Sequence, residues 1–145
     1  MKPIEIALNE YGTKGVAGIL NNAEVVKYFK EIGHGWVKDD ETAWCAAFLN
    51  WVLKKAGKIH TGALNARSFL TYGVSTKTPQ VGDIVVLWRI SRNGPYGHCG
   101  LFVRQTKNTV FILGGNQLNQ VCIQEYSKEY LLDYRQIPLA SKAVI

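Results

Sequence analysis

The sequence has no apolar segment long enough to cross a lipid bilayer, and its first residues, Met1–Glu5, lack the apolar core of a signal peptide. These absences argue against membrane insertion. They predict a protein that is made in the cytoplasm without a signal peptide. Repeats, low-complexity tracts and long linkers are also missing. We therefore expect the 145 residues to form one domain over residues 1–145, with a single hydrophobic core.

Cysteine is scarce, and its count of three is odd. Without a secretion signal, this count argues against a disulfide framework and leaves room for one functional thiol and two structural ones. The metal-binding patterns HExxH and CxxC are absent. The acidic segment Asp39-Asp40-Glu41 is better explained by helix capping than by calcium binding. We therefore expect neither a metal nor another cofactor.

Acidic residues are outnumbered, since 11 Asp and Glu face 17 Lys and Arg and leave a net charge of +6. A basic surface keeps a protein soluble, and it also attracts polyanions. The basic residues are scattered and no nucleic-acid-binding motif is present, so nucleic acid is not an expected partner. A bacterial envelope rich in anionic polymers fits the same charge.

The hydrophobic spacing changes halfway along the chain, from a helical period to short β-branched runs separated by turn residues. Helices followed by hairpin-linked strands predict an α+β domain, in which N-terminal helices pack on an antiparallel sheet of about five strands. The expected helices are Pro3–Tyr11, Asn21–Ile32, Asp40–Ala56 and Ala63–Tyr72, and the expected strands are Ile84–Ile90, His98–Arg104, Thr109–Leu113, Val121–Ile123 and Tyr134–Ile137.

One thiol lies where a helix start would activate it. Cys45 follows a polar segment at the beginning of an apolar helix, and the N–H groups and dipole there favour a thiolate. His98 lies between Gly97 and Gly100, which leave space around an imidazole that would act as general base. Asn116 offers an amide oxygen to orient that ring. The order cysteine, histidine, asparagine is typical of a cysteine hydrolase.

Each of these residues also has a structural interpretation. A cysteine in an apolar helix is often core, a strand histidine is often only hydrogen-bonded, and Gly-Gly-Asn is a common turn. Strand alternation places Cys99 on the face opposite to His98, so we interpret Cys99 as a small core residue. Cys122, between Val121 and Ile123, receives the same interpretation.

Several motifs in order carry a family resemblance. They are Asp40–Phe48 with W-C-A-A-F, Pro79–Val86, Gly97–Gly100 with G-H-C-G, and Leu113–Gln117 with L-G-G-N-Q. Together they resemble the CHAP and NlpC-type cysteine peptidases, papain-like cell-wall hydrolases, and in particular a compact phage-associated branch. The resemblance spans residues 3 to 138. Cys99 departs from it, because the family more often has an aliphatic residue there.

The resemblance implies a papain-like fold and cleavage of an amide bond in peptidoglycan. It implies Cys45 as nucleophile, His98 as base and Asn116 as the polar third member. The substrate bond would be the N-acetylmuramoyl-L-alanine amide or an amide within the stem peptide. We also expect Trp44, Tyr96 and Gln117 to line the substrate groove.

Four interpretations remain open at this point. The chain is interpreted first as a phage endolysin that acts on the cell wall or periplasm after release. The alternatives are a secreted antibacterial amidase with an immunity protein as partner, a non-catalytic wall-binding or phage structural module, and a cysteine acyltransferase of the same fold. We expect a monomer whose main partner is peptidoglycan.

Overall fold

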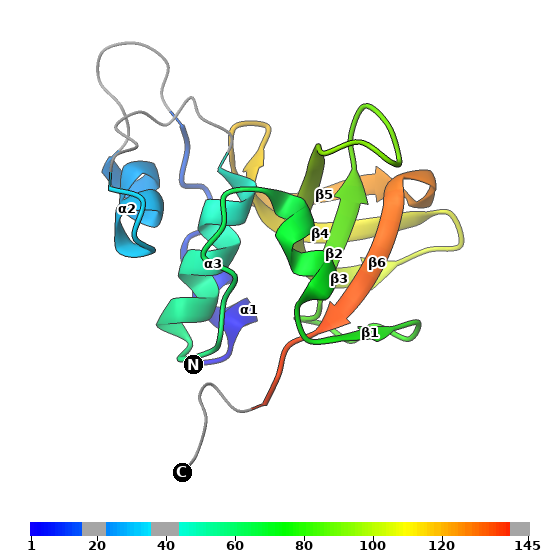
Figure 1. Cartoon of the computed structure of the whole chain (residues 1–145), viewed down its shortest axis with the longest axis horizontal. Helices are drawn as coiled ribbons and strands as arrows, with labels where there is room; N and C mark the ends of the chain where they lie inside the picture. The colour runs from blue at the N-terminus through cyan, green and yellow to red at the C-terminus, as the bar shows by residue number, and fades with distance from the viewer. Residues whose placement is uncertain (16–22, 36–43, 140–145) are drawn as a thin grey trace.

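The computed structural model describes residues 1–15, 23–35 and 44–139 (Figure 1). It confirms the α+β prediction, with helices at the N-terminal end and an antiparallel sheet after them. The helical elements are α1 (Pro3–Asn9), α2 (Ala23–Glu31), α3 (Cys45–Lys55) and the 3₁₀ turns η1 (Ala66–Thr71) and η2 (Lys128–Tyr130). The strands are β1 (Val74–Thr76), β2 (Ile84–Trp88), β3 (Gly97–Gln105), β4 (Thr109–Gln117), β5 (Gln120–Ser127) and β6 (Leu131–Gln136).

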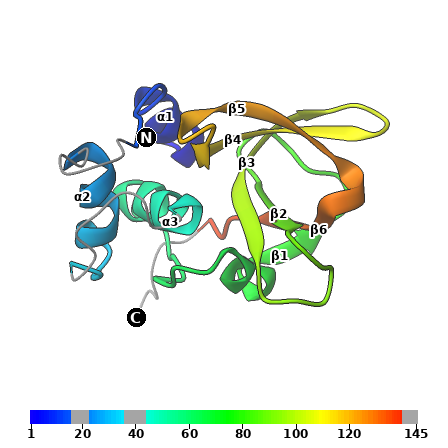
Figure 2. The same ribbon diagram turned by 90° about the horizontal axis from the view of Figure 1, so that it is seen from above.

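The strands form one sheet in the order β1-β6-β2-β3-β4-β5, and every neighbouring pair is antiparallel. The sheet is strongly curved when seen from above, and the three α-helices lie together on one side of it (Figure 2). Strand β1 was not predicted, because it is only three residues long and Val74 is 64% exposed, so no pattern of buried residues marks it. No helix in the described residues is long and apolar enough to cross a membrane.

Helix α3 is the centre of the core, and its residues from Cys45 to Leu53 are all buried. A sequence that is apolar on nearly every side requires neighbours all round. Here α1, α2, η1 and one face of the sheet supply them. A second apolar cluster fills the other face of the curved sheet, with Val85, Leu87, Phe102, Val110, Ile112 and Tyr134.

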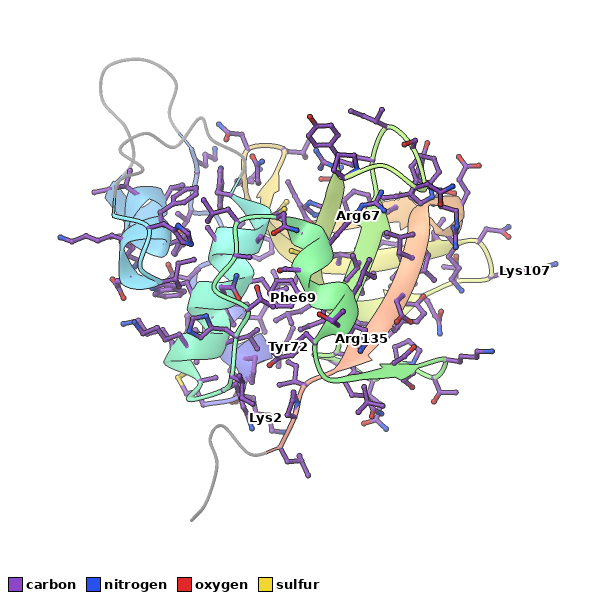
Figure 3. The ribbon with its side chains drawn as sticks, viewed as in Figure 1. Lys2, Arg67, Phe69, Tyr72, Lys107 and Arg135 are labelled. Carbon is purple, nitrogen blue, oxygen red and sulfur yellow. The ribbon has the colours of Figure 1, made fainter. Side chains whose placement is uncertain are left out.

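A side chain in the middle of α3 fixes the segment that leads to the site. Asn50 is fully buried, and its side chain accepts a hydrogen bond from the Thr61 backbone N–H at 2.9 Å and donates one to the Ala63 carbonyl at 2.9 Å. These bonds hold the chain beside the helix before it enters η1. Phe69 of η1 is also fully buried and lies between η1 and α3 (Figure 3).

Two predicted helices differ in detail. Helix α3 begins at Cys45, with Trp44 as its N-cap, rather than directly after Asp40, which lies outside the described residues. The segment expected as a fourth helix is the 3₁₀ turn η1. The later start of α3 makes Cys45 the first helical residue rather than the fifth after Asp40.

The β4–β5 hairpin gives a stability prediction. Gln117 pairs with Gln120, so Leu118 and Asn119 form a two-residue loop with φ angles of 52° and 57°. Residues other than Asn, Asp and Gly are disfavoured there, and Leu118 is 75% exposed, so its side chain contributes little burial. Leu118→Asn should raise the free energy of unfolding by about 0.5–1 kcal/mol. The measurement is urea unfolding beside Leu139→Asn, an exposed control. An unfolding midpoint no higher than that of the wild type would contradict the prediction.

Candidate active site

Cys45 occupies the first position of α3, where the helix N–H groups have no partner within the helix. Its side chain is almost buried, at 7% exposure, but it lines a surface cleft of about 450 Å³. The other lining residues come from the segment before η1 and from the end of the β2–β3 loop: Leu64, Asn65, Ala66, Pro95, Tyr96 and Gly97. The dipole of α3 therefore acts on the Cys45 thiol, and the cleft gives the thiol access to the surface.

The pKa of the Cys45 thiol is well below its usual range. The largest cause is a hydrogen bond from the Cys99 side chain, while burial acts in the opposite direction and raises the pKa. The charge of His98 and a hydrogen bond with it lower the pKa further. A thiolate is the nucleophilic form of cysteine, so Cys45 is prepared for attack on a carbonyl carbon.

Cys99 is a core residue, as predicted, and it also forms a hydrogen bond with Cys45. Strand alternation was interpreted correctly, because Cys99 is fully buried in the cluster around α3 while His98 borders a cavity lined by Tyr126. The same alternation directs Cys99 to Cys45. Burial and the neighbouring Cys45 raise the pKa of Cys99, so the Cys99 thiol keeps its proton and donates a hydrogen bond to the Cys45 thiolate.

Cys99→Val tests this contact. Valine keeps most of the buried volume but removes the S–H donor, so the pKa of Cys45 should rise. The rate of Cys45 alkylation by iodoacetamide, followed against pH, should shift to higher pH than in the wild type. Cys122→Ala, which removes a buried thiol that bonds the Gln117 carbonyl, should leave the profile in place. Overlapping profiles for Cys99→Val and wild type would show that the Cys99 donor has no effect.

His98 is buried, at 1% exposure, and its ring is held by Gln117. The His98 Nε2 atom lies 2.9 Å from Gln117 Oε1. The Gln117 amide nitrogen donates to the carbonyls of Ile112 at 3.0 Å and Cys122 at 2.6 Å, so its oxygen must be the atom that faces His98. In the neutral ring Nε2 therefore carries the proton, and Nδ1 is left as the acceptor.

Gln117 takes the position that the sequence assigned to Asn116. Asn116 makes no hydrogen bond to His98 in the described part of the chain, and its φ is +59°. The β4–β5 register shifts between Gly114 and Gln117, so a bulge interrupts the strand alternation there. Asparagine tolerates this left-handed conformation, and the bulge points Gln117 into the protein. The amide expected to orient the His98 ring is therefore corrected from that of Asn116 to that of Gln117.

Of the three residues predicted to line the substrate groove, the structure places only one in the cleft. Tyr96 is 60% exposed and lines the cleft beside Cys45, where a groove residue is expected. Trp44 is fully buried and stacks on Tyr28, so its assignment to the groove is wrong. Gln117 is 1% exposed and touches His98 rather than the groove. An aromatic residue before a helix start suits a core or a groove equally well, which is why sequence alone misplaced Trp44.

Close packing explains one glycine of the L-G-G-N-Q motif. A Cβ atom on Gly115 would lie 2.8 Å from the Phe48 Cβ and from the Trp44 ring. No side chain fits there without moving the start of α3, and with it Cys45. The glycine therefore lets β4 approach the helix that carries the thiol.

Arg67 of η1 holds the loop that forms one wall of the cleft (Figure 3). Its guanidinium donates to the carbonyls of Tyr96 at 2.9 Å, Arg92 at 2.8 Å and Ser91 at 2.9 Å. Three bonds from one planar group fix the loop relative to η1. The position of Tyr96 beside Cys45 follows from this clamp.

The described residues contain no group of three or more His, Cys, Asp or Glu side chains that could hold a metal ion. The segment Asp39-Asp40-Glu41, weighed above for calcium, lies outside the described residues. The expectation of a metal-free site therefore stays a prediction.

Comparisons with known proteins agree with this fold. Among solved structures, a protein from Staphylococcus aureus described as similar to lipoprotein, NLP/P60 family, has a similar fold with a TM-score of 0.52 at 18% identity. The alignment covers 94% of this chain but only 40% of that one. No curated protein sequence matches the chain. The CHAP domain family matches residues 37–116, a segment that includes Cys45 and His98. Because this match extends over more than half of the 145 residues, the chain belongs to the CHAP domain family.

Proposed function

We propose that this chain is a cysteine hydrolase that cleaves an amide bond of peptidoglycan. The CHAP domain family is a family of peptidoglycan hydrolases, which in general are cysteine peptidases or amidases. The observation that carries the proposal is the arrangement of three residues. Cys45 starts α3 with a lowered thiol pKa, its partner is His98, and Gln117 fixes the His98 ring. This is the geometry that nucleophile, base and orienting group require.

Acylation uses His98 Nδ1, the ring nitrogen that does not face Gln117. With its proton already on this nitrogen, Cys45 is a thiolate, and the thiolate forms a bond with the carbonyl carbon of the scissile amide. The carbonyl oxygen becomes an oxyanion beside the Cys45 backbone N–H, which has no partner within α3. As the C–N bond breaks, the His98 imidazolium gives its proton to the leaving amine. A thioester on Cys45 remains.

Deacylation reverses the proton path. Water enters in place of the amine and gives a proton to His98 Nδ1 as its oxygen attacks the thioester carbon. The Cys45 sulfur leaves as a thiolate, the species that the Cys99 donor stabilises. Gln117 keeps its bond to Nε2–H throughout, so the ring does not need to reorient between the steps.

The bond and the biological setting complete the proposal. The bond is the N-acetylmuramoyl-L-alanine amide or an amide of the stem peptide, and the setting is a phage endolysin. The motif resemblance supports both, and the net charge of +6 fits a substrate embedded in anionic wall polymers.

Mass spectrometry of purified peptidoglycan after digestion tests the reaction and identifies the bond. An amidase would release intact stems with a free L-alanine amino group, whereas an endopeptidase would release shortened stems. The absence of any cleaved amide in the presence of folded protein would contradict the proposal and favour a wall-binding module.

A further inference from the structure

A second cavity lies beside His98, in addition to the cleft that contains Cys45. Its volume is about 250 Å³, and His98 lies in its wall. Gly97, the preceding residue of β3, lines the cleft that contains Cys45. The two cavities are therefore lined by consecutive residues of one strand and flank the Cys45–His98 pair. The other residues of the second cavity used below are Trp88, Arg89, Ile90, Tyr126 and Tyr130.

Arg89 provides the charge of this cavity. Its side chain is exposed, and within the described residues no carboxylate forms an ion pair with it. Its Nη2 atom lies 3.5 Å from His98 Nδ1, which is the outer limit of a hydrogen bond. A guanidinium in this position favours an anion, and carboxylates match its planar geometry.

The walls around Arg89 are aromatic. The rings of Trp88 and Tyr130 pack edge to face at 4.9 Å between centroids, and Trp88 Nε1 donates to the Glu129 carbonyl at 3.2 Å. The hydroxyl of Tyr126 lies 3.2 Å from His98 Nε2. These walls accept a small apolar group next to the charged one.

Ile90 forms part of the rim in an unusual backbone conformation. Its φ is +69° and its side chain is 84% exposed. A β-branched residue with positive φ is disfavoured, and such conformations concentrate at binding sites. The loop thus places the apolar Ile90 side chain at the mouth of the cavity, although isoleucine disfavours this backbone conformation.

We propose that this cavity is a carboxylate-selective subsite, in which Arg89 binds a free carboxylate that lies a few bonds from the scissile amide. The inference rests on the proposed function, because it names the substrate class for that site: acyl peptides with a free carboxylate and a small apolar neighbour. Binding of the carboxylate also draws Arg89 away from His98 Nδ1. Nδ1 is then free to hold the proton beside the Cys45 thiolate.

Two alkylating reagents of nearly equal size test the subsite without peptidoglycan. Iodoacetate carries a carboxylate, whereas iodoacetamide carries a neutral amide. The rate of each reaction at Cys45 is followed at one pH by peptide mass spectrometry. The ratio of the two rates cancels changes in thiolate reactivity and reports only the preference for a carboxylate.

Arg89→Gln should lower the iodoacetate-to-iodoacetamide ratio by about 3–10-fold. Arg89→Lys, which keeps the charge, should retain most of the ratio. Arg92→Gln is the matched control, because Arg92 is an exposed arginine of the same loop that donates to the Leu131 carbonyl at 3.3 Å. An unchanged ratio in Arg89→Gln, or an equal fall in Arg92→Gln, would overturn the subsite.

Substrate analogues extend the test to the hydrolytic reaction. Amidation of the substrate carboxylate should raise KM for the wild type and have little effect on KM for Arg89→Gln. The two proposals fail separately. A carboxylate preference in alkylation without peptidoglycan cleavage would overturn the proposed function alone, and cleavage without any Arg89-dependent preference would overturn the subsite alone.

Discussion

Cys45→Ala is expected to lower the hydrolysis of purified peptidoglycan by at least about 10³-fold. The variant retains His98 and Gln117, but no other sulfur occupies the start of α3. Cys99 is held on β3 with its thiol pKa raised, so it cannot replace the missing thiolate. Removing one buried sulfur should reduce the free energy of unfolding by only about 1–2 kcal/mol. The measurements are turbidity loss of peptidoglycan suspensions and thermal unfolding.

Cys122→Ala is the control for this prediction, since it removes the same atom from a buried cysteine, 5% exposed, on β5. It should unfold at a similar temperature and keep most of the activity. Comparable activity of Cys45→Ala and Cys122→Ala, with both folded, would remove Cys45 from the role of nucleophile.

Gln117→Ala is expected to produce the second-largest loss, about 10–100-fold in kcat, which is part of the contribution of a well-placed general base. Without the amide oxygen, His98 loses the acceptor that fixes its ring and its Nε2–H tautomer. The carbonyls of Ile112 and Cys122 also lose their donor, so stability should fall by roughly 2–4 kcal/mol. Hydrolysis and iodoacetamide alkylation of Cys45 are measured well below the melting temperature.

Two controls separate orientation from destabilisation. Leu113→Ala truncates a fully buried residue of the same strand and should match the loss of stability, yet it should keep the pH profile of Cys45 alkylation. Asn116→Gly preserves the left-handed backbone and should act almost like the wild type. The reverse result, with Asn116→Gly impaired and Gln117→Ala active, would restore Asn116 as the third member.

Much of the fold could be predicted because its signals are local. The change from helical to strand spacing marks the transition from α1–α3 to the sheet, and the apolar run of α3 predicts its burial. Strand alternation correctly separates Cys99 from His98. A cysteine at a helix start and a glycine-flanked histidine were also visible without coordinates. Strand β1 left no such signal, because it is short and exposed.

The rest of the site depends on non-local geometry. The bulge before Gln117 breaks the two-residue alternation, so spacing alone selected its neighbour, Asn116. The asparagine after two glycines was the available clue, since asparagine is the residue that best tolerates positive φ after glycine. The contact of Cys99 with Cys45 requires the packing of α3 on β3, and the cavity at Arg89 is lined by residues that are far apart in the sequence. No sequence period encodes either of these.

Detection of the acyl-enzyme tests the central claim most directly. The wild-type protein is mixed with soluble peptidoglycan fragments, quenched in acid within a single turnover, and digested for peptide mass spectrometry. We expect an acyl group from the fragment on the peptide that contains Cys45, linked as a thioester that hydroxylamine removes. The adduct should be absent from Cys45→Ala and from protein alkylated with iodoacetamide. Amide cleavage without any adduct on Cys45, or cleavage that persists after Cys45 is alkylated, would contradict the account.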